Sequence, residues 1–246
     1  MSQFGNIMRA LPPVTKNLII INFIVWLAMM VIPRSLGVDV MKLGALHYIE
    51  APDFNILQLF TYMFMHSTGS FAHILFNMFS LFMFGITLER LFGAKRFLFF
   101  YITCGFGAAL IQEGVWALTL PDMIIDGLAQ ANHTSYEAIS QWVAAQPHIL
   151  VDNYDFFTTI GASGAIYGVL LAFGMLFPDR PLYLMFIPVP IKAKWMIVGF
   201  VVLELLIGLS SANDGVAHFA HLGGMFVGFL IILYWKKRGI INGRYY

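Results

Sequence analysis

Charged residues are scarce in this chain. Asp, Glu, Lys and Arg make up 11% of its 246 residues, while hydrophobic residues make up 59%. A soluble globular domain carries roughly a quarter charged residues, so the composition excludes an ordinary soluble domain. It favours a polytopic membrane protein in which lipid replaces water at the surface. The formal net charge of +1 offers no basic surface, and no nucleic-acid partner is expected.

Cysteine is almost absent. The single Cys104 lies in an apolar stretch, so an intramolecular disulfide and a CxxC metal site are both excluded. The His-Glu-x-x-His motif of zinc proteases is missing as well, and so is the pair of aspartates within apolar stretches that an aspartyl protease would need. We therefore expect neither a metal nor a cofactor.

The chain does contain six apolar stretches that are long enough, or nearly so, to cross a bilayer. They cover residues 14–32, 71–91, 97–118, 156–177, 195–209 and 216–235. The first ends without a small-residue cleavage site and is read as a retained helix. The prediction is an all-α bundle of six transmembrane helices, with one membrane domain over residues 14–235 and short tails at 1–13 and 236–246.

Basic residues gather on one side of these expected spans. Ten of the fourteen Lys and Arg residues fall in the two tails and in the connections after the second and fourth spans, and Lys16 and Arg90 lie at the adjoining ends of the first and second spans. Arg34 and Lys42 fall on the other side. Most acidic residues share the side of Arg34 and Lys42. By the positive-inside rule, both termini are predicted to be cytoplasmic.

Two long connections lie on the outer side. Residues 33–70 contain short apolar pieces, such as 54–65, that are too short to span. This connection is predicted to lie at the membrane interface or to re-enter the membrane, packed on the protein. Residues 119–159 carry no Lys or Arg and include a predicted short amphipathic helix at 136–143.

Four polar residues on three expected spans fall at a similar depth. His73 and Asn77 lie near the outer start of the second span, Ser163 about seven residues into the fourth, and His221 about five residues into the sixth. At about 1.5 Å per residue, all four are predicted to lie within the outermost 10 Å or so.

Small residues accompany the serine and the histidine. Gly164 and Gly168 are spaced four apart, as are Gly224 and Gly228. Glycines at this spacing let helices approach closely in a membrane. The fourth and sixth spans are therefore expected to pack together and to bring the serine to the histidine.

This grouping has the chemistry of acyl transfer. A serine hydroxyl becomes a nucleophile when an adjacent base takes its proton, and we expect His221 to be the base for Ser163. His73 and Asn77, one turn apart, together with the Ser163 N–H, are expected to donate hydrogen bonds to the oxyanion. Tyr167, one turn after Ser163, is expected to stack on the imidazole or otherwise position it.

No carboxylate is placed beside the histidine by sequence. Asp214 is in a loop, and Glu113 and Glu204 each stand alone in an apolar stretch. The sequence therefore predicts a Ser–His dyad rather than a triad. His218, three residues before His221 and nearer the surface, is predicted to line a water path to the site.

Taken together, four short motifs resemble those of the rhomboid intramembrane serine proteases, over roughly residues 14–235. They are His73-Ile-Leu-Phe-Asn77, Gly161-Ala-Ser-Gly164 with Tyr167, Ala220-His221-Leu-Gly-Gly224 with Gly228, and Leu88-Glu89-Arg90-Leu-Phe-Gly93.

The resemblance implies a six-helix fold that cleaves transmembrane helices near the outer membrane face. It implies Ser163 as nucleophile, His221 as base, oxyanion stabilisation by His73 and Asn77, and no metal. The expected partners are the lipid bilayer and single-span or other transmembrane substrates. The expected location is a bacterial inner membrane, with the active site opening to the periplasmic side.

One departure and two alternatives remain. Many rhomboids carry a Trp-Arg pair in the first outer loop, where this chain has Leu57-Gln58, which puts the anchoring of that loop in doubt. The alternatives are a non-proteolytic rhomboid-like protein that binds membrane proteins, and a transporter or channel. An inactive relative would lose the serine or the histidine, and the lack of an inverted repeat argues weakly against a transporter.

Overall fold

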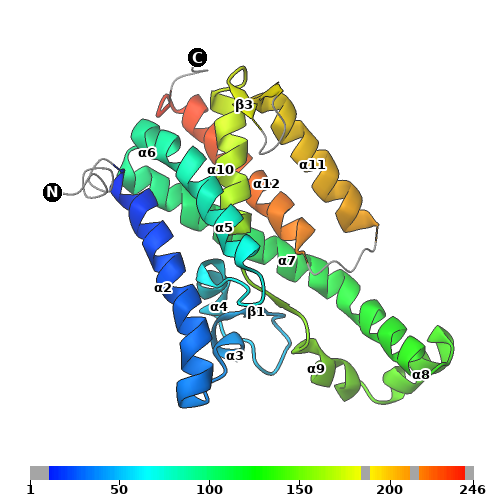
Figure 1. Ribbon diagram of the computed structural model, residues 1–246. Coiled ribbons are helices and arrows are strands. Elements are labelled where there is room, and N and C mark those ends of the chain that lie inside the picture. Colours follow the sequence, from blue (N-terminus) through cyan, green and yellow to red (C-terminus); the bar gives the residue numbers. More distant parts are fainter. Residues whose placement is uncertain (1–10, 184–188, 211–215, 242–246) are drawn as a thin grey trace.

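The computed structural model describes residues 11–183, 189–210 and 216–241, and most of them are helical (Figure 1). The helical segments in chain order are α2 (Pro13–Leu36), α3 (Val40–Gly44), α4 (Gln58–Thr61), η1 (Tyr62–Phe64), α5 (Phe71–Ser80), η2 (Leu81–Gly85), α6 (Ile86–Phe92), α7 (Ala94–Ala131), α8 (Tyr136–Ala145), α9 (His148–Tyr154), α10 (Ser163–Leu176), α11 (Ala193–Leu209) and α12 (His218–Lys237). All six predicted apolar stretches are helical over most of their length.

Four of the described helical segments are long and apolar enough to cross a membrane: 13–36, 71–92, 94–131 and 218–237. The other two predicted spans form shorter helices, α10 with 14 residues and α11 with 17. At 1.5 Å per residue these helices are about 21 Å and about 26 Å long.

The helix α10 starts later than predicted. Residues 156–162 were expected to belong to the fourth span, but the helix begins at Ser163. The preceding segment is extended because β2 (Thr158–Thr159) pairs with β1 (Leu46–His47) in an antiparallel sheet. Gly161, with a φ of 133°, then turns the chain into the helix. Ser163 is therefore the first residue of α10 rather than the seventh or so of a span.

The helix α7 extends well beyond the predicted end at 118. It continues through Pro121 to Ala131, and its last turns bury Ile125 and Ala129 against α8 and α9 in a small apolar cluster. The predicted amphipathic helix at 136–143 is present as α8. Much of the second outer connection is therefore a helical arm that projects from the bundle (Figure 1).

The first outer connection packs on the bundle, as predicted. Leu59, Tyr62 and Met63 are all buried in the main core. The Tyr62 carbonyl accepts a hydrogen bond from Gly161 N–H at 3.0 Å, and the Tyr62 hydroxyl donates to the Gly105 carbonyl at 2.7 Å. These bonds tie the connection to the residues just before Ser163 and to α7.

One helical rod carries the second predicted span. The segments α5, η2 and α6 follow one another without a break, and η2 is a π-helical turn at residues 81–85. Near its end, Glu89 accepts hydrogen bonds from the backbone N–H groups of Val14 at 2.9 Å and Thr15 at 2.7 Å. The carboxylate thus satisfies amides at the start of α2 and fixes the first span to the second.

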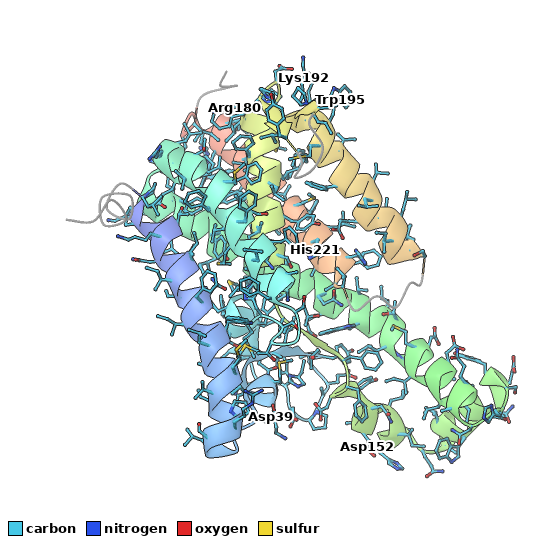
Figure 2. All side chains as sticks on the ribbon, in the orientation of Figure 1. Asp39, Asp152, Arg180, Lys192, Trp195 and His221 are labelled. Carbon is cyan, nitrogen blue, oxygen red and sulfur yellow. The ribbon has the colours of Figure 1, made fainter. Side chains whose placement is uncertain are left out.

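Charge is segregated along the bundle. Arg180 lies beside the hairpin of β3 (Pro181–Tyr183) and β4 (Pro190–Lys192), and Figure 2 shows it with Lys192 at one end of the molecule. Asp39 and Asp152 lie toward the opposite end (Figure 2). The start of α2 and the end of α12 are on the side of the basic residues (Figure 1). The two faces of the expected topology are therefore separate in space.

Candidate active site

A serine and a histidine from two different helices meet inside the bundle. The Oγ atom of Ser163, at the start of α10, lies 2.8 Å from Nε2 of His221, near the start of α12. His221 is 8% exposed and is labelled in Figure 2 between the ribbons. The pair has the geometry in which a serine O–H donates to a neutral imidazole nitrogen.

Glycines set the close approach of α10 and α12. A Cβ atom on Gly224 would overlap the carbonyl oxygen of Gly164, and one on Gly228 would lie 3.2 Å from the Cα of Gly168. Each contact joins one glycine of the pair on α10 (Gly164 and Gly168) to one glycine of the pair on α12 (Gly224 and Gly228). A larger residue at Gly224 would force the two helix backbones apart.

His73 presents a hydrogen-bond donor toward the serine. Its Nδ1 accepts from the backbone N–H of Ser67 at 3.3 Å, so the neutral ring carries its proton on Nε2. A Cβ atom at Gly161 would lie 2.9 Å from that Nε2 and 3.5 Å from the Oγ of Ser163. Gly161 therefore leaves open the space between the His73 donor and the serine.

A second histidine packs against His73. The ring of His66 lies 5.0 Å from that of His73, and His66 is completely buried. Burial, together with the neighbouring His73, lowers the pKa of His66 to about 4. His66 is thus neutral at physiological pH and adds no competing charge beside the site.

Asn77 lies one turn beyond His73 on α5. Its Nδ2 donates to the His73 carbonyl at 2.9 Å, and the side chain is 7% exposed. An amide nitrogen has two N–H groups, so one of them remains available to a ligand. Tyr167 lies on another side of the site and stacks on His221, with ring centres 4.2 Å apart and planes 6° apart.

One cavity of about 480 Å³ is lined by His73, Asn77, Ser163, Tyr167 and His221, among others. Its wall joins α5, α10 and α12 and also includes Phe200 of α11. Apolar side chains make up much of the wall, and its polar side chains include those of His73, Asn77 and Ser163. The cavity is large enough for a short extended peptide segment and for water.

Comparison with known proteins identifies the family. The Rhomboid domain model matches residues 53–238, which is more than half of the chain. The chain belongs to the rhomboid family. With its several apolar helices, this rhomboid is an integral, multi-pass membrane protein.

Three relatives are similar at low identity. The rhomboid protease AarA of Providencia stuartii is 28% identical over 181 residues, which is 69% of this chain and 52% of AarA. RHOMBOID-like protein 5 of Arabidopsis thaliana is 26% identical over 206 residues, 83% of this chain and 53% of that protein. The mitochondrial Rhomboid protein 1 of Saccharomyces cerevisiae is 28% identical over 171 residues, 70% of this chain and 40% of that protein. The chain spans about half the length of the relatives it matches.

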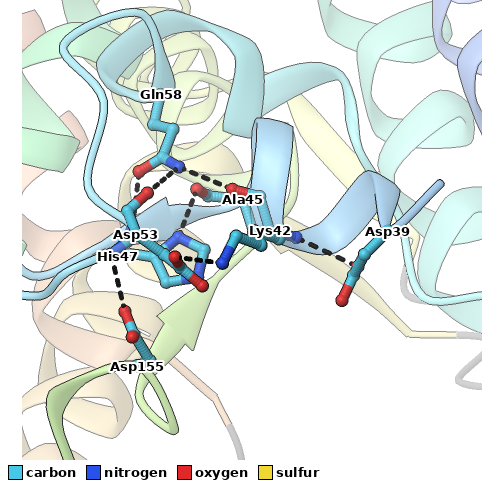
Figure 3. A network of polar contacts seen from close by, with 7 residues as sticks. All are labelled: Asp39, Lys42, Ala45, His47, Asp53, Gln58 and Asp155. Carbon is cyan, nitrogen blue, oxygen red and sulfur yellow. Dashed lines mark hydrogen bonds and ion pairs between the residues drawn. The ribbon is translucent and has the colours of Figure 1, made fainter. Parts of the chain in front are cut away.

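The connection after α2, which is predicted to lie on the outer side, is anchored without the Trp-Arg pair (Figure 3). Gln58 is fully buried; its Nε2 donates to the carbonyls of Lys42 and Asp53 at 3.0 and 2.9 Å, and its Oε1 accepts from His47 N–H at 3.3 Å. Lys42 Nζ also pairs with Asp53 at 2.5 Å, which raises the pKa of Lys42. This local network of hydrogen bonds and an ion pair anchors the loop, although Leu57-Gln58 stands in place of the Trp-Arg pair.

The carboxylate of Glu204, for which the sequence predicted no partner, lies beside His221. Oε1 of Glu204, from α11, is 3.1 Å from His221 Nδ1. The atoms are within ion-pair distance but out of line for a hydrogen bond, so Nδ1 is a buried polar atom without one. The expectation that no carboxylate reaches this histidine is wrong. A carboxylate in an apolar helix needs a polar partner. The sequence does not show which residue that is, because the partner lies on another helix.

His218 lies beside Glu204, and its place on a water path to the site stays a prediction. It is buried, and its Nδ1 lies 2.6 Å from Oε2 of Glu204, whereas the residues that line the cavity do not include it. Glu204, His218 and His221 offer ligand atoms within 4.8 Å of one another, so this set could hold a metal ion. So could His47, Asp53 and Asp155 near the loop network.

Proposed function

We propose that this rhomboid is an intramembrane serine endopeptidase that cleaves transmembrane segments of other membrane proteins near the outer membrane face. The observation that carries the proposal is the 2.8 Å separation of Ser163 Oγ and His221 Nε2 in the wall of a cavity. The Ser163 oxygen attacks the scissile carbonyl as its proton passes to His221. His221 then gives that proton to the leaving amine, and water releases the acyl group with His221 again acting as base.

The oxyanion of the tetrahedral intermediate is held by three donors. They are the Nε2–H of His73, the side-chain amide of Asn77 and the backbone N–H of Ser163. As the first residue of α10, Ser163 has an N–H with no partner inside its own helix. Fixed donors of this kind cost no reorganisation when charge develops in a site with little water.

In this proposal all six helices cross the membrane and both termini lie in the cytoplasm. The catalytic unit covers residues 14–235, between tails at 1–13 and 236–246. The membrane is the bacterial inner membrane, and the cavity opens to the periplasm. Single-span or other transmembrane substrates reach it through the lipid. A non-proteolytic binding role, or a transporter or channel, would leave the paired serine and histidine without a purpose.

The test uses the purified chain in proteoliposomes with a fluorophosphonate probe and a single-span model substrate. We expect the probe to label Ser163 and the substrate to be cut. Ser163→Ala and His221→Ala should each lower cleavage by about 10³-fold or more, while a chelator should leave it unchanged. Full cleavage by Ser163→Ala would assign the nucleophile elsewhere, and inhibition by the chelator that zinc reverses would favour a metal mechanism.

A further inference from the structure

Glu204 is a buried carboxylate to which the proposed two-residue chemistry gives no role. It is 5% exposed and lies on α11, where the other buried residues are Ala193 and Ile197. Placing a carboxylate in an apolar helix is costly unless other groups compensate it. Its retention therefore needs an explanation in terms of what it contacts.

Three side chains from two neighbouring helices surround this carboxylate. The Tyr167 hydroxyl of α10 donates a hydrogen bond to Oε1. His218 Nδ1 of α12 lies 2.6 Å from Oε2, and His221 Nδ1 lies 3.1 Å from Oε1. Tyr167 and His218 hold the carboxylate in place, and His221 is the group that it faces without a formed hydrogen bond.

Glu204 and Ser163 approach opposite nitrogens of the same imidazole. Ser163 Oγ faces Nε2 at 2.8 Å, while Glu204 faces Nδ1. Ser163 and His221 line the cavity, and Glu204 does not. The substrate therefore meets one side of the ring, and the carboxylate lies behind the other, which is the relative placement that a serine–histidine–carboxylate triad requires.

We propose that Glu204 is a positioning residue that completes a Ser163–His221–Glu204 relay. The inference rests on the proposed protease function and deepens it. The carboxylate keeps the proton of neutral His221 on Nδ1, which leaves Nε2 free to accept the Ser163 proton. When that proton arrives, the imidazolium has a counter-charge 3.1 Å from Nδ1, and the ion pair forms during the reaction rather than before it.

The same contacts have a competing explanation, in which the Glu204 carboxylate has only a structural role and holds α11 against α10 and α12. In that case its removal would lower stability and leave turnover by the folded protein unchanged. A positioning role predicts a loss of kcat with little change in KM, because Glu204 does not line the cavity where substrate binds.

The experiment compares Glu204→Gln, which removes the charge at constant shape, with Glu204→Asp, which keeps it. We measure kcat and KM for the model substrate and the rate of fluorophosphonate labelling at Ser163. Glu204→Gln should lower kcat and labelling by about 10²- to 10⁴-fold, as loss of a triad carboxylate does elsewhere, with KM within about twofold of wild type. Glu204→Asp should recover part of that loss.

The matched control is Glu113→Gln. Glu113 is another carboxylate of an apolar helix, but it accepts from the Ile49 N–H at 2.8 Å and does not line the cavity. Its turnover should be unchanged. Turnover by folded Glu204→Gln within about twofold of wild type overturns the inference, as does a Glu204→Asp variant no faster than Glu204→Gln. If Glu204→Gln does not fold, folded Glu204→Asp is compared with wild type, and an unchanged kcat then overturns the inference, because the shorter side chain moves the carboxylate away from His221. Absence of labelling in the wild type would instead overturn the proposed function, so the two failures are distinguishable.

Discussion

Asn77 is the side chain whose contribution is most open to measurement. It lines the cavity one turn from His73 and has one amide hydrogen left over after it binds the His73 carbonyl. We expect Asn77→Ala to lower kcat by about 10²- to 10³-fold, the range found for the loss of one oxyanion donor, with the melting temperature nearly unchanged. Steady-state cleavage checks this, and an unchanged kcat would remove Asn77 from the oxyanion site.

Individual site residues differ in how far the sequence alone could locate them. His73 and Asn77 share a helical face at a spacing of four, so one helix suffices to bring them together. The partners of Glu204 could not be predicted in this way, because all three come from α10 and α12 and depend on how α11 packs on those helices. An unpaired charge in an apolar stretch signals a missing partner, but spacing along the chain does not name that partner.

The contact between α10 and α12 depends on the absence of side chains at the glycines. Gly224→Ala would place a Cβ in the carbonyl oxygen of Gly164, and neither backbone can move without moving its helix. We expect a loss of about 1–3 kcal/mol in stability, the usual cost of overpacking, together with slower labelling of Ser163. Thermal unfolding in detergent and probe labelling measure the two effects.

Gly199→Ala is the matched control for this change. Gly199 is also helical, on α11, and a Cβ there would meet nothing within 4 Å. It should unfold at or slightly above the wild-type temperature, because alanine is the better helix former. Equal melting temperatures for Gly224→Ala and wild type would mean that the helices tolerate a wider separation.

Helix boundaries show where sequence reasoning ends. The apolar run 156–177 reads as one span, yet its first seven residues are not helical because the β1–β2 pairing and Gly161 hold them in another conformation. Conversely, α7 continues past 118 because Ile125 and Ala129 find apolar partners in α8 and α9. In both cases a tertiary contact overrides the local apolar pattern, and such contacts are not visible in a single sequence.

The distribution of charge over the whole molecule predicts which end of the bundle faces the cytoplasm. Basic residues such as Arg180 and Lys192 lie at one end and Asp39 and Asp152 toward the other (Figure 2), which matches the grouping expected from the sequence. Such segregation predicts that the basic end, with both termini, faces the cytoplasm. The second outer connection with its helix α8 should then face the periplasm.

The near absence of cysteine makes this orientation measurable in intact cells. Cys104 is completely buried, so the wild type should not react with a membrane-impermeant maleimide. Glu137 in α8 and Lys237 at the end of α12 are both exposed, and each can be replaced by cysteine. Glu137→Cys should label in intact cells and Lys237→Cys only after the membrane is permeabilised, because the reagent reaches just the outer face. The reverse pattern would invert the topology and place the cavity, with Ser163 and His221, on the cytoplasmic side.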